Sequence, residues 1–64
     1  MTLTEKLAAE YKIDTWPPDK RATGYQHLAD MARDLRDFPK YRVAIVRDTR
    51  EALAATRDTK DVWL

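Results

Sequence analysis

Apolar side chains recur at helical spacing through the first 38 residues. Thr2 and Glu5 match a capping box, in which a Thr hydroxyl accepts a backbone N–H and the Glu three residues later reaches back. The apolar residues that follow predict a first helix from Leu3 to Lys12. A longer series recurs every three or four residues: Tyr25, Leu28, Met31, Leu35 and Phe38. It begins after two prolines and ends before Pro39, so it predicts a second helix from about residue 18 to Asp37.

The pattern changes after Pro39. Tyr41 to Val46 contains the run of β-branched residues that is typical of a strand. Asp48 is a residue type that caps helices, and the Ala-rich segment behind it predicts a third helix from about Thr49 to Arg57. Asp61 to Leu64 is predicted to be a short last strand or a docking tail.

These elements predict one small domain over residues 1–64, of the α+β class. Its order is two N-terminal helices, a short strand, a third helix and a short C-terminal strand. Fourteen residues separate Val46 from Asp61, which is enough for a crossover, so residues 41–64 would form a minimal parallel βαβ unit. A two-stranded sheet is marginal alone, so the strand could instead pair with its own copy in a symmetric dimer. A third alternative makes residues 40–57 one helix and the chain an all-α, three-helix protein.

The composition excludes several classes of function. The chain has 64 residues with no Cys, no Ser and one Gly. A disulfide scaffold, a Cys-based zinc site, a Ser or Cys nucleophile and a glycine-rich phosphate loop are therefore excluded. A domain of this size has little volume for a substrate pocket, so we expect no enzyme and no cofactor. Apolar runs reach only four residues and the start lacks the pattern of a secretory signal, so we expect a cytoplasmic protein with no membrane partner.

One possible polar site lies on the second predicted helix. His27, Asp30 and Asp34 are spaced by three and four residues, which could indicate a metal site or an acid–base pair. Transition metals commonly need three or more good ligands, and an acid–base pair needs a dry pocket. Because the stripe lies largely opposite Leu28 and Leu35, we expect it to face solvent and to bind no metal.

The N-terminal half resembles part of a helix-turn-helix motif. That motif requires a small residue early in its first helix and an apolar residue after the turn, as Ala8 and Ile13 would be. The turn usually contains Gly, where this chain has Lys12. The resemblance implies that the second predicted helix would present Lys20 and Arg21 to DNA. The alternative function is therefore a small dimeric DNA-binding transcriptional regulator.

Arginine and aromatic residues favour a partner of another kind. Six Arg lie within 25 residues: Arg33, Arg36, Arg42, Arg47, Arg50 and Arg57. The planar guanidinium suits carboxylates and phosphates, but interspersed acidic residues leave the chain a net charge of only +1. Trp16 is expected in the core, whereas Trp63 suits a core role and an interface role equally.

The leading hypothesis is a small, non-enzymatic protein–protein interaction module. Such a module would be an adaptor, a small subunit, or a phage- or plasmid-type inhibitor that acts by binding. Its partner would be another protein or a second copy of this chain, as in a homodimer; nucleic acid is a partner only under the alternative. The predicted strand edge and the last residues supply the expected partner-binding side chains, which are Tyr41, Arg42, Val62, Trp63 and Leu64.

Overall fold

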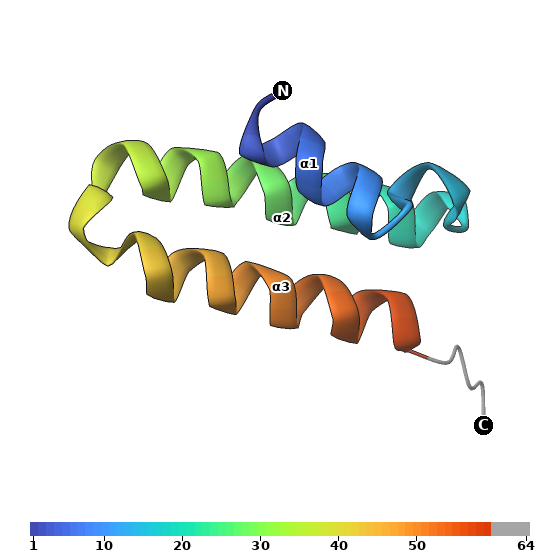
Figure 1. The fold of residues 1–64 in the computed structure, drawn as a ribbon. Helices are drawn as coiled ribbons and strands as arrows, with labels where there is room; N and C mark the ends of the chain where they lie inside the picture. Colours follow the sequence, from blue (N-terminus) through green and yellow to red (C-terminus); the bar gives the residue numbers. More distant parts are fainter. Residues whose placement is uncertain (60–64) are drawn as a thin grey trace.

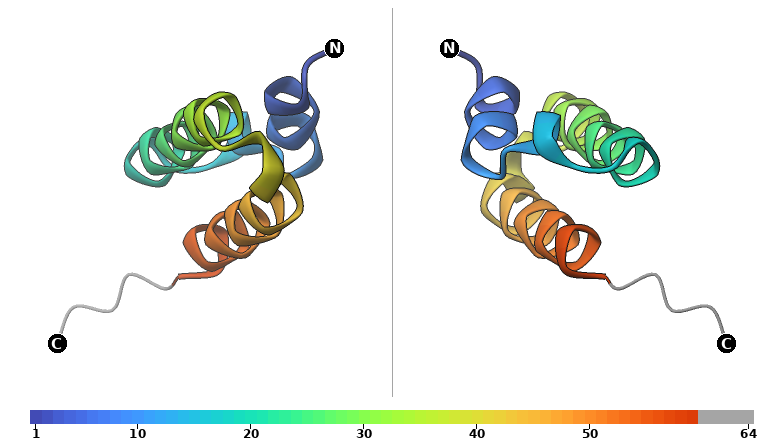
Figure 2. Two further views of the ribbon diagram at one scale, coloured as in Figure 1. Left: turned by 90° about the vertical axis from the view of Figure 1, so that its left-hand side faces the viewer. Right: turned by 90° about the vertical axis from the view of Figure 1, so that its right-hand side faces the viewer.

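Three helices and two short 3₁₀ helices make up the computed structural model, which describes residues 1–59. In chain order the elements are α1 (Leu3–Glu10), η1 (Ile13–Thr15), α2 (Pro18–Asp37), η2 (Pro39–Tyr41) and α3 (Arg42–Asp58). α2 and α3 form an antiparallel hairpin that closes at η2, and α1 lies against one side of it (Figure 1). Seen end-on, the three helices occupy the corners of a triangle (Figure 2).

The α+β prediction is wrong, because the described residues contain no strand and the fold is all-α. The segment predicted as a strand, 41–46, instead ends η2 and begins α3, and the helix predicted over 49–57 begins at Arg42. The all-α alternative is the one that agrees with the structure. Because residues 42–46 are helical, the βαβ unit cannot form and this segment offers a second copy no strand to pair with. The predicted last strand, 61–64, lies outside the described residues.

Packing explains why a β-branched run is helical here. Ile45 and Val46 pack against the core, and the buried Thr49 and Leu53 follow on the same face of α3. Thr49 and Leu53 lie four and eight residues after Ile45, which is the spacing of one helix face. The intrinsic cost of Val and Ile in a helix is below ~1 kcal/mol per residue, so burial against α2 decides the conformation.

The predicted N-terminal half is confirmed with small changes. α2 covers the predicted range, Pro18–Asp37, and its prolines stand at the start of the helix. Thr2 caps α1 as predicted, since its hydroxyl accepts the N–H of Glu5 at 3.1 Å. α1 ends at Glu10 rather than at Lys12, because Lys12 adopts the left-handed conformation, with φ 53° and ψ 46°.

The core draws on α1, η1, α2 and α3. Its fully or nearly buried side chains are Leu7, Ile13, Trp16, Leu28, Met31 and Leu53. The apolar series predicted for α2 is buried only in its middle, since Tyr25 and Phe38 are 41% and 54% exposed and Leu35 is half-buried. No helix among residues 1–59 is long and apolar enough to cross a bilayer.

Trp16 packs directly on α2, as predicted. Its indole N–H donates to the carbonyl of Tyr11 at 3.0 Å, which satisfies the one polar atom of the ring. Beneath the ring lies Gly24, where a Cβ would be 2.7 Å from Trp16 Cζ3 and 3.3 Å from Ile13 Cγ2. The single glycine of the chain is therefore the residue that lets η1 and its tryptophan approach α2 closely.

We expect Gly24→Ala to destabilise the fold by about 1–2 kcal/mol. The added methyl group would press on a buried ring, which outweighs the gain of about 1 kcal/mol that Ala brings to a helix interior. Urea unfolding followed by circular dichroism measures the difference. Thr23→Ala, an exposed neighbour in the same turn, is the control and should be neutral or slightly stabilising. A more stable Gly24→Ala variant would show that Trp16 does not sit against this helix.

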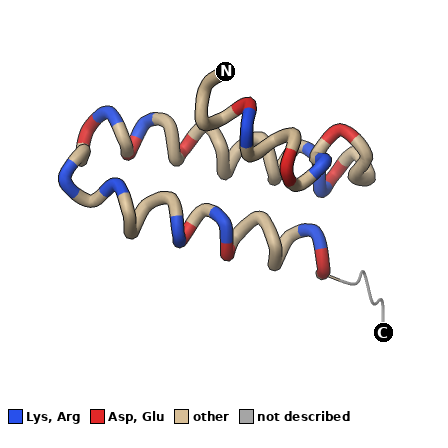
Figure 3. The backbone as a smooth tube through the Cα atoms, in the orientation of Figure 1, with Lys and Arg blue, Asp and Glu red and all other residues tan. Residues whose placement is uncertain are grey.

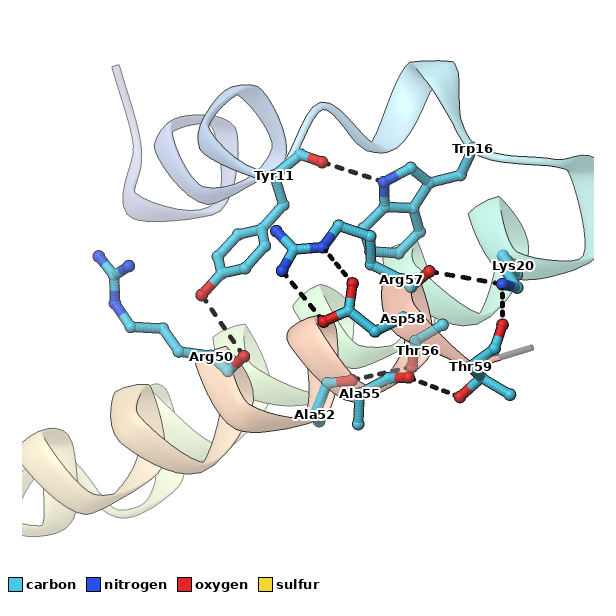
Figure 4. A network of polar contacts seen from close by, with 10 residues as sticks. All are labelled: Tyr11, Trp16, Lys20, Arg50, Ala52, Ala55, Thr56, Arg57, Asp58 and Thr59. Carbon is cyan, nitrogen blue, oxygen red and sulfur yellow. Dashed lines mark hydrogen bonds and ion pairs between the residues drawn. The ribbon is translucent and has the colours of Figure 1, made fainter.

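α1 is tied to α3 through Tyr11 (Figure 4). The Tyr11 hydroxyl donates to the carbonyl of Arg50 at 3.4 Å, and the Arg57 guanidinium lies 5.6 Å from the Tyr11 ring centre. Arg57 also donates to Asp58 at 2.9 Å, which lowers the pKa of that carboxyl. These contacts fix α1 against the C-terminal half of α3.

Candidate functional site

The closed end of the α2–α3 hairpin projects past α1 (Figure 1). We call residues 33–50 the hairpin end. Three large apolar side chains are exposed there within six residues: Phe38 and Tyr41 at 54% each, and Val43 at 82%. Single exposed apolar side chains are common on protein surfaces, but a group of them at one place is a feature of binding surfaces.

A groove runs between the start of α1 and the first turns of α3. We call it the Val43 groove; its volume is about 530 Å³ and its lining residues are Leu3, Arg42, Val43, Val46, Arg47, Arg50 and Glu51. Leu3, Val43 and Val46 supply its apolar surface. Val46 and Arg50 lie three and seven residues after Val43 on one face of α3, which is why they line the same groove.

Positive charge gathers at the same end of the molecule (Figure 3). Residues 33–50 hold six basic and three acidic residues, a net charge of +3, whereas the other described residues hold five basic and seven acidic, a net charge of −2. Most of these arginines pair with an adjacent aspartate. Within residues 1–59, neither Lys40 nor Arg42 forms an ion pair, and the Lys40 ammonium lies 5.6 Å from the Tyr41 ring centre.

Arg50 forms the inner edge of the Val43 groove. It makes an ion pair with Glu10 of α1, and this hydrogen bond raises the already high pKa of its guanidinium. Arg50 is therefore charged at any pH of interest. Its pairing with α1 holds it in place beside the groove.

Two of the predicted partner-binding residues lie in this region. Tyr41 ends η2 and Arg42 begins α3. Tyr41 lines a groove with Phe38, whereas Arg42 lines the Val43 groove. The reason differs from the prediction, since they sit at a helical hairpin rather than on a strand edge. Phe38 was named only as the last member of the apolar series of α2, and Val43 was not singled out. A helical interpretation of residues 42–58 would have found Val43, because it shares a face with Val46 and Arg47.

The other three predicted residues, Val62, Trp63 and Leu64, lie outside the described residues. The last described residue, Thr59, directly follows the last turn of α3. The 17 residues of α3 span about 25 Å. Thr59 and Tyr41 are therefore at opposite ends of α3.

The alternative DNA-binding residues, Lys20 and Arg21, lie in the first turn of α2. The Lys20 ammonium donates to the carbonyls of Arg57, at 3.4 Å, and of Thr59 (Figure 4). It thus covers the C-terminal end of α3, where backbone carbonyls lack partners. α2 begins six residues after Lys12, which is longer than the three- or four-residue turn of a helix-turn-helix. DNA binding stays a prediction.

Lys20→Ala should lower the free energy of unfolding by about 0.5–1 kcal/mol. The variant leaves the last carbonyls of α3 without their cation. It also removes the side-chain contact that links the start of α2 to the end of α3. Thermal unfolding at low and high salt measures this effect, which should shrink as salt screens the charge. Lys6→Ala, which removes an exposed lysine from α1, is the matched control. Equal shifts for the two variants would mean that Lys20 does not cap α3.

The His27 stripe lies beside α3, with the Asp30 and Asp34 side chains 42% and 41% exposed. His27, Asp30 and Asp34 are half-buried and line one side of a groove of about 190 Å³ between α2 and α3, with Asp48 on the other side. His27 Nε2 lies 3.2 Å from the Thr56 hydroxyl, so the ring bridges the two helices. Among residues 1–59, no group of three or more His, Cys, Asp or Glu is placed to hold a metal ion.

Comparisons of the chain with protein-family models, with curated proteins and with solved structures found no match.

Proposed function

We propose that this protein is a small, non-enzymatic protein–protein interaction module that binds its partner through the hairpin end. The observation that carries the proposal is the exposure of Phe38, Tyr41 and Val43 at the closed end of the hairpin, which projects past α1. Their side chains are apolar and their neighbours are basic. A helical domain this small gains stability when a partner covers such a surface.

The residue types at this end are those that contribute most to protein interfaces. Tyr and Arg are enriched among the residues whose truncation weakens binding, and Tyr41 and Arg42 are adjacent here. Their backbone is fixed in η2 and the first turn of α3, so little conformational freedom is lost on binding. The module would act as an adaptor, a small subunit or an inhibitor, in each case by binding alone.

Site-specific photo-crosslinking in the host cell tests this function. A photoreactive phenylalanine analogue at position 43 should give one defined adduct after illumination. The same analogue at position 22, an exposed position near the opposite end of α2, is the control and should give none. The mass of the adduct distinguishes a foreign partner from a second copy. The absence of an adduct at position 43, or the same adducts at both positions, would contradict the proposal.

Residues 62–64 form a second, separate part of the proposal. Val62, Trp63 and Leu64 are apolar, and we expect their deletion to weaken partner binding more than Lys20→Ala combined with Arg21→Ala. Sedimentation of each variant mixed with the partner that the crosslinking identifies measures this loss of binding. The DNA-binding alternative predicts the opposite order. Normal assembly by the shortened chain would restrict the partner surface to the hairpin end.

A further inference from the structure

α1 is much shorter than the hairpin it packs against. Its 8 residues span about 12 Å, whereas the 20 residues of α2 span about 30 Å. Leu3, at the start of α1, lines the Val43 groove beside Val46, and Glu10, at its end, pairs with Arg50. The first turn of α3, which carries Val43, therefore extends beyond the start of α1. The Val43 groove occupies the place where a longer first helix would continue.

The helical surroundings of the groove favour a helix as its occupant. An extended peptide gains affinity by pairing its backbone with the edge of a sheet, and residues 1–59 contain no strand. A helix satisfies its own backbone hydrogen bonds and needs only an apolar stripe to contact Leu3, Val43 and Val46. α1 and the residue after it contact α3 through side chains: Glu10 pairs with Arg50, and the Tyr11 ring lies against Arg57.

The charge around the groove favours an acidic occupant. Arg42, Arg47 and Arg50 lie along it, against one acidic lining residue, Glu51. Arg42 makes no ion pair among the described residues, and Arg47 pairs only with Asp48, its exposed neighbour. A helix with carboxylates beside its apolar stripe would give Arg42 and Arg47 partners across the interface.

A second copy of this chain is a poor occupant by the same criteria. In a dimer that joined the grooves of two copies, the arginines of one copy would face the arginines of the other. The outward face of the longest helix also lacks an apolar stripe, because α2 presents Ala22, Gln26, Ala29 and Arg33 to solvent. The outward face of α2 therefore offers no acidic amphipathic stripe to the groove of a second copy.

From these observations we infer that the Val43 groove binds an acidic, amphipathic α-helix of a partner protein, laid end to end with α1. The inference rests on the proposed function and adds the chemistry of the partner. In the complex, apolar side chains of the partner helix would contact Val43 and Val46. Its carboxylates would contact Arg42 and Arg47.

Titration of the isotope-labelled full chain with designed peptides tests the inference. The acidic probe has about 14 residues, near the length at which an isolated helix forms, with Leu at every third or fourth position and Glu beside them. One matched probe replaces each Glu by Lys, and another scrambles the acidic sequence so that no apolar stripe remains. Only the acidic amphipathic probe should bind, with amide shifts concentrated at Leu3, Val43 and Val46.

Val43→Asp should weaken binding of the acidic probe at least about tenfold. Asp in the first turn of a helix favours the helix dipole, so this variant should stay folded. Thr23→Asp, which adds the same charge at an exposed site on α2, should bind as the original chain does. Equal binding by the scrambled or the Lys probe, or shifts outside the groove, would overturn the inference.

Titration with a short DNA duplex distinguishes a peptide-binding groove from a nucleic-acid surface. If the duplex shifts the same amides with a steeper salt dependence than the acidic peptide, the groove region is a nucleic-acid surface and the inference fails. A crosslinked partner at position 43 together with no binding of the acidic probe would leave the proposed function standing and reject only the partner chemistry. Probe binding without any adduct at position 43 would reject the proposed function in the cell.

Discussion

Trp16→Ala should leave most of the chain unfolded at room temperature. Large-to-small substitution of a buried Trp costs about 3–5 kcal/mol, and a core of this size rarely supplies more than about that much. The indole is only 7% exposed, lies against the Gly24 backbone and donates to Tyr11. Its removal would open a cavity between η1 and α2 that a glycine on the opposite wall cannot fill.

Far-UV circular dichroism with urea and heat measures this loss. Fluorescence is unsuitable, because Trp63 also emits. Trp16→Phe is the matched variant: it retains an aromatic ring but loses the indole N–H, so its loss should be smaller than that of Trp16→Ala. A melting temperature for Trp16→Ala within a few degrees of the original would place the indole outside the core.

The N-terminal half could be predicted because its local signals agree with its packing. The prolines before Asp19 and at position 39 bound α2 in the sequence as they do in the structure. Leu28 and Met31 are buried at the helical spacing from which the helix was predicted. Thr2 caps α1 through the hydrogen bond that the capping box implies. Where the local conformational preference and the burial of a segment favour the same element, that element can be predicted from one sequence.

The start of α3 was not predicted because Thr49 interrupts the apolar pattern of its buried face. Thr49 is 9% exposed, and its hydroxyl donates to the carbonyl of Ile45 at 2.8 Å within the same helix. A buried Thr satisfied by its own helix is stable there, yet it interrupts an apolar periodicity. Without a visible continuation of that periodicity, the run from Tyr41 to Val46 resembles a strand.

The same error hid half of the candidate site. Alternation along a strand places Val43 and Val46 on opposite faces, whereas the helix places both in the Val43 groove. Tyr41 and Arg42 were found because large aromatic and arginine side chains suit an interface in any backbone conformation. The space beyond α1 depends on how three helices of unequal length stack, which no local pattern encodes.

Arg47→Pro separates the observed helix from the predicted strand most sharply. Position 47 is the sixth residue of α3, and the exposed Arg47 side chain pairs, among residues 1–59, only with the adjacent Asp48. Proline there would lose the backbone N–H and clash with the carbonyl of Val43, at a cost of about 3 kcal/mol or more. Had residues 41–46 formed a strand, position 47 would lie in a connection and would tolerate proline.

Arg47→Ala isolates the backbone effect, because it removes the same side chain without disturbing the helix. It should change the stability by no more than about 0.5 kcal/mol. If α3 restarted at the introduced proline, the residues before it would unwind and Ile45 and Val46 would leave the core, so the loss of stability would persist. Urea unfolding of the two variants side by side gives the answer. Equal stabilities would mean that residues 42–46 are not helical, and with them the Val43 groove would disappear.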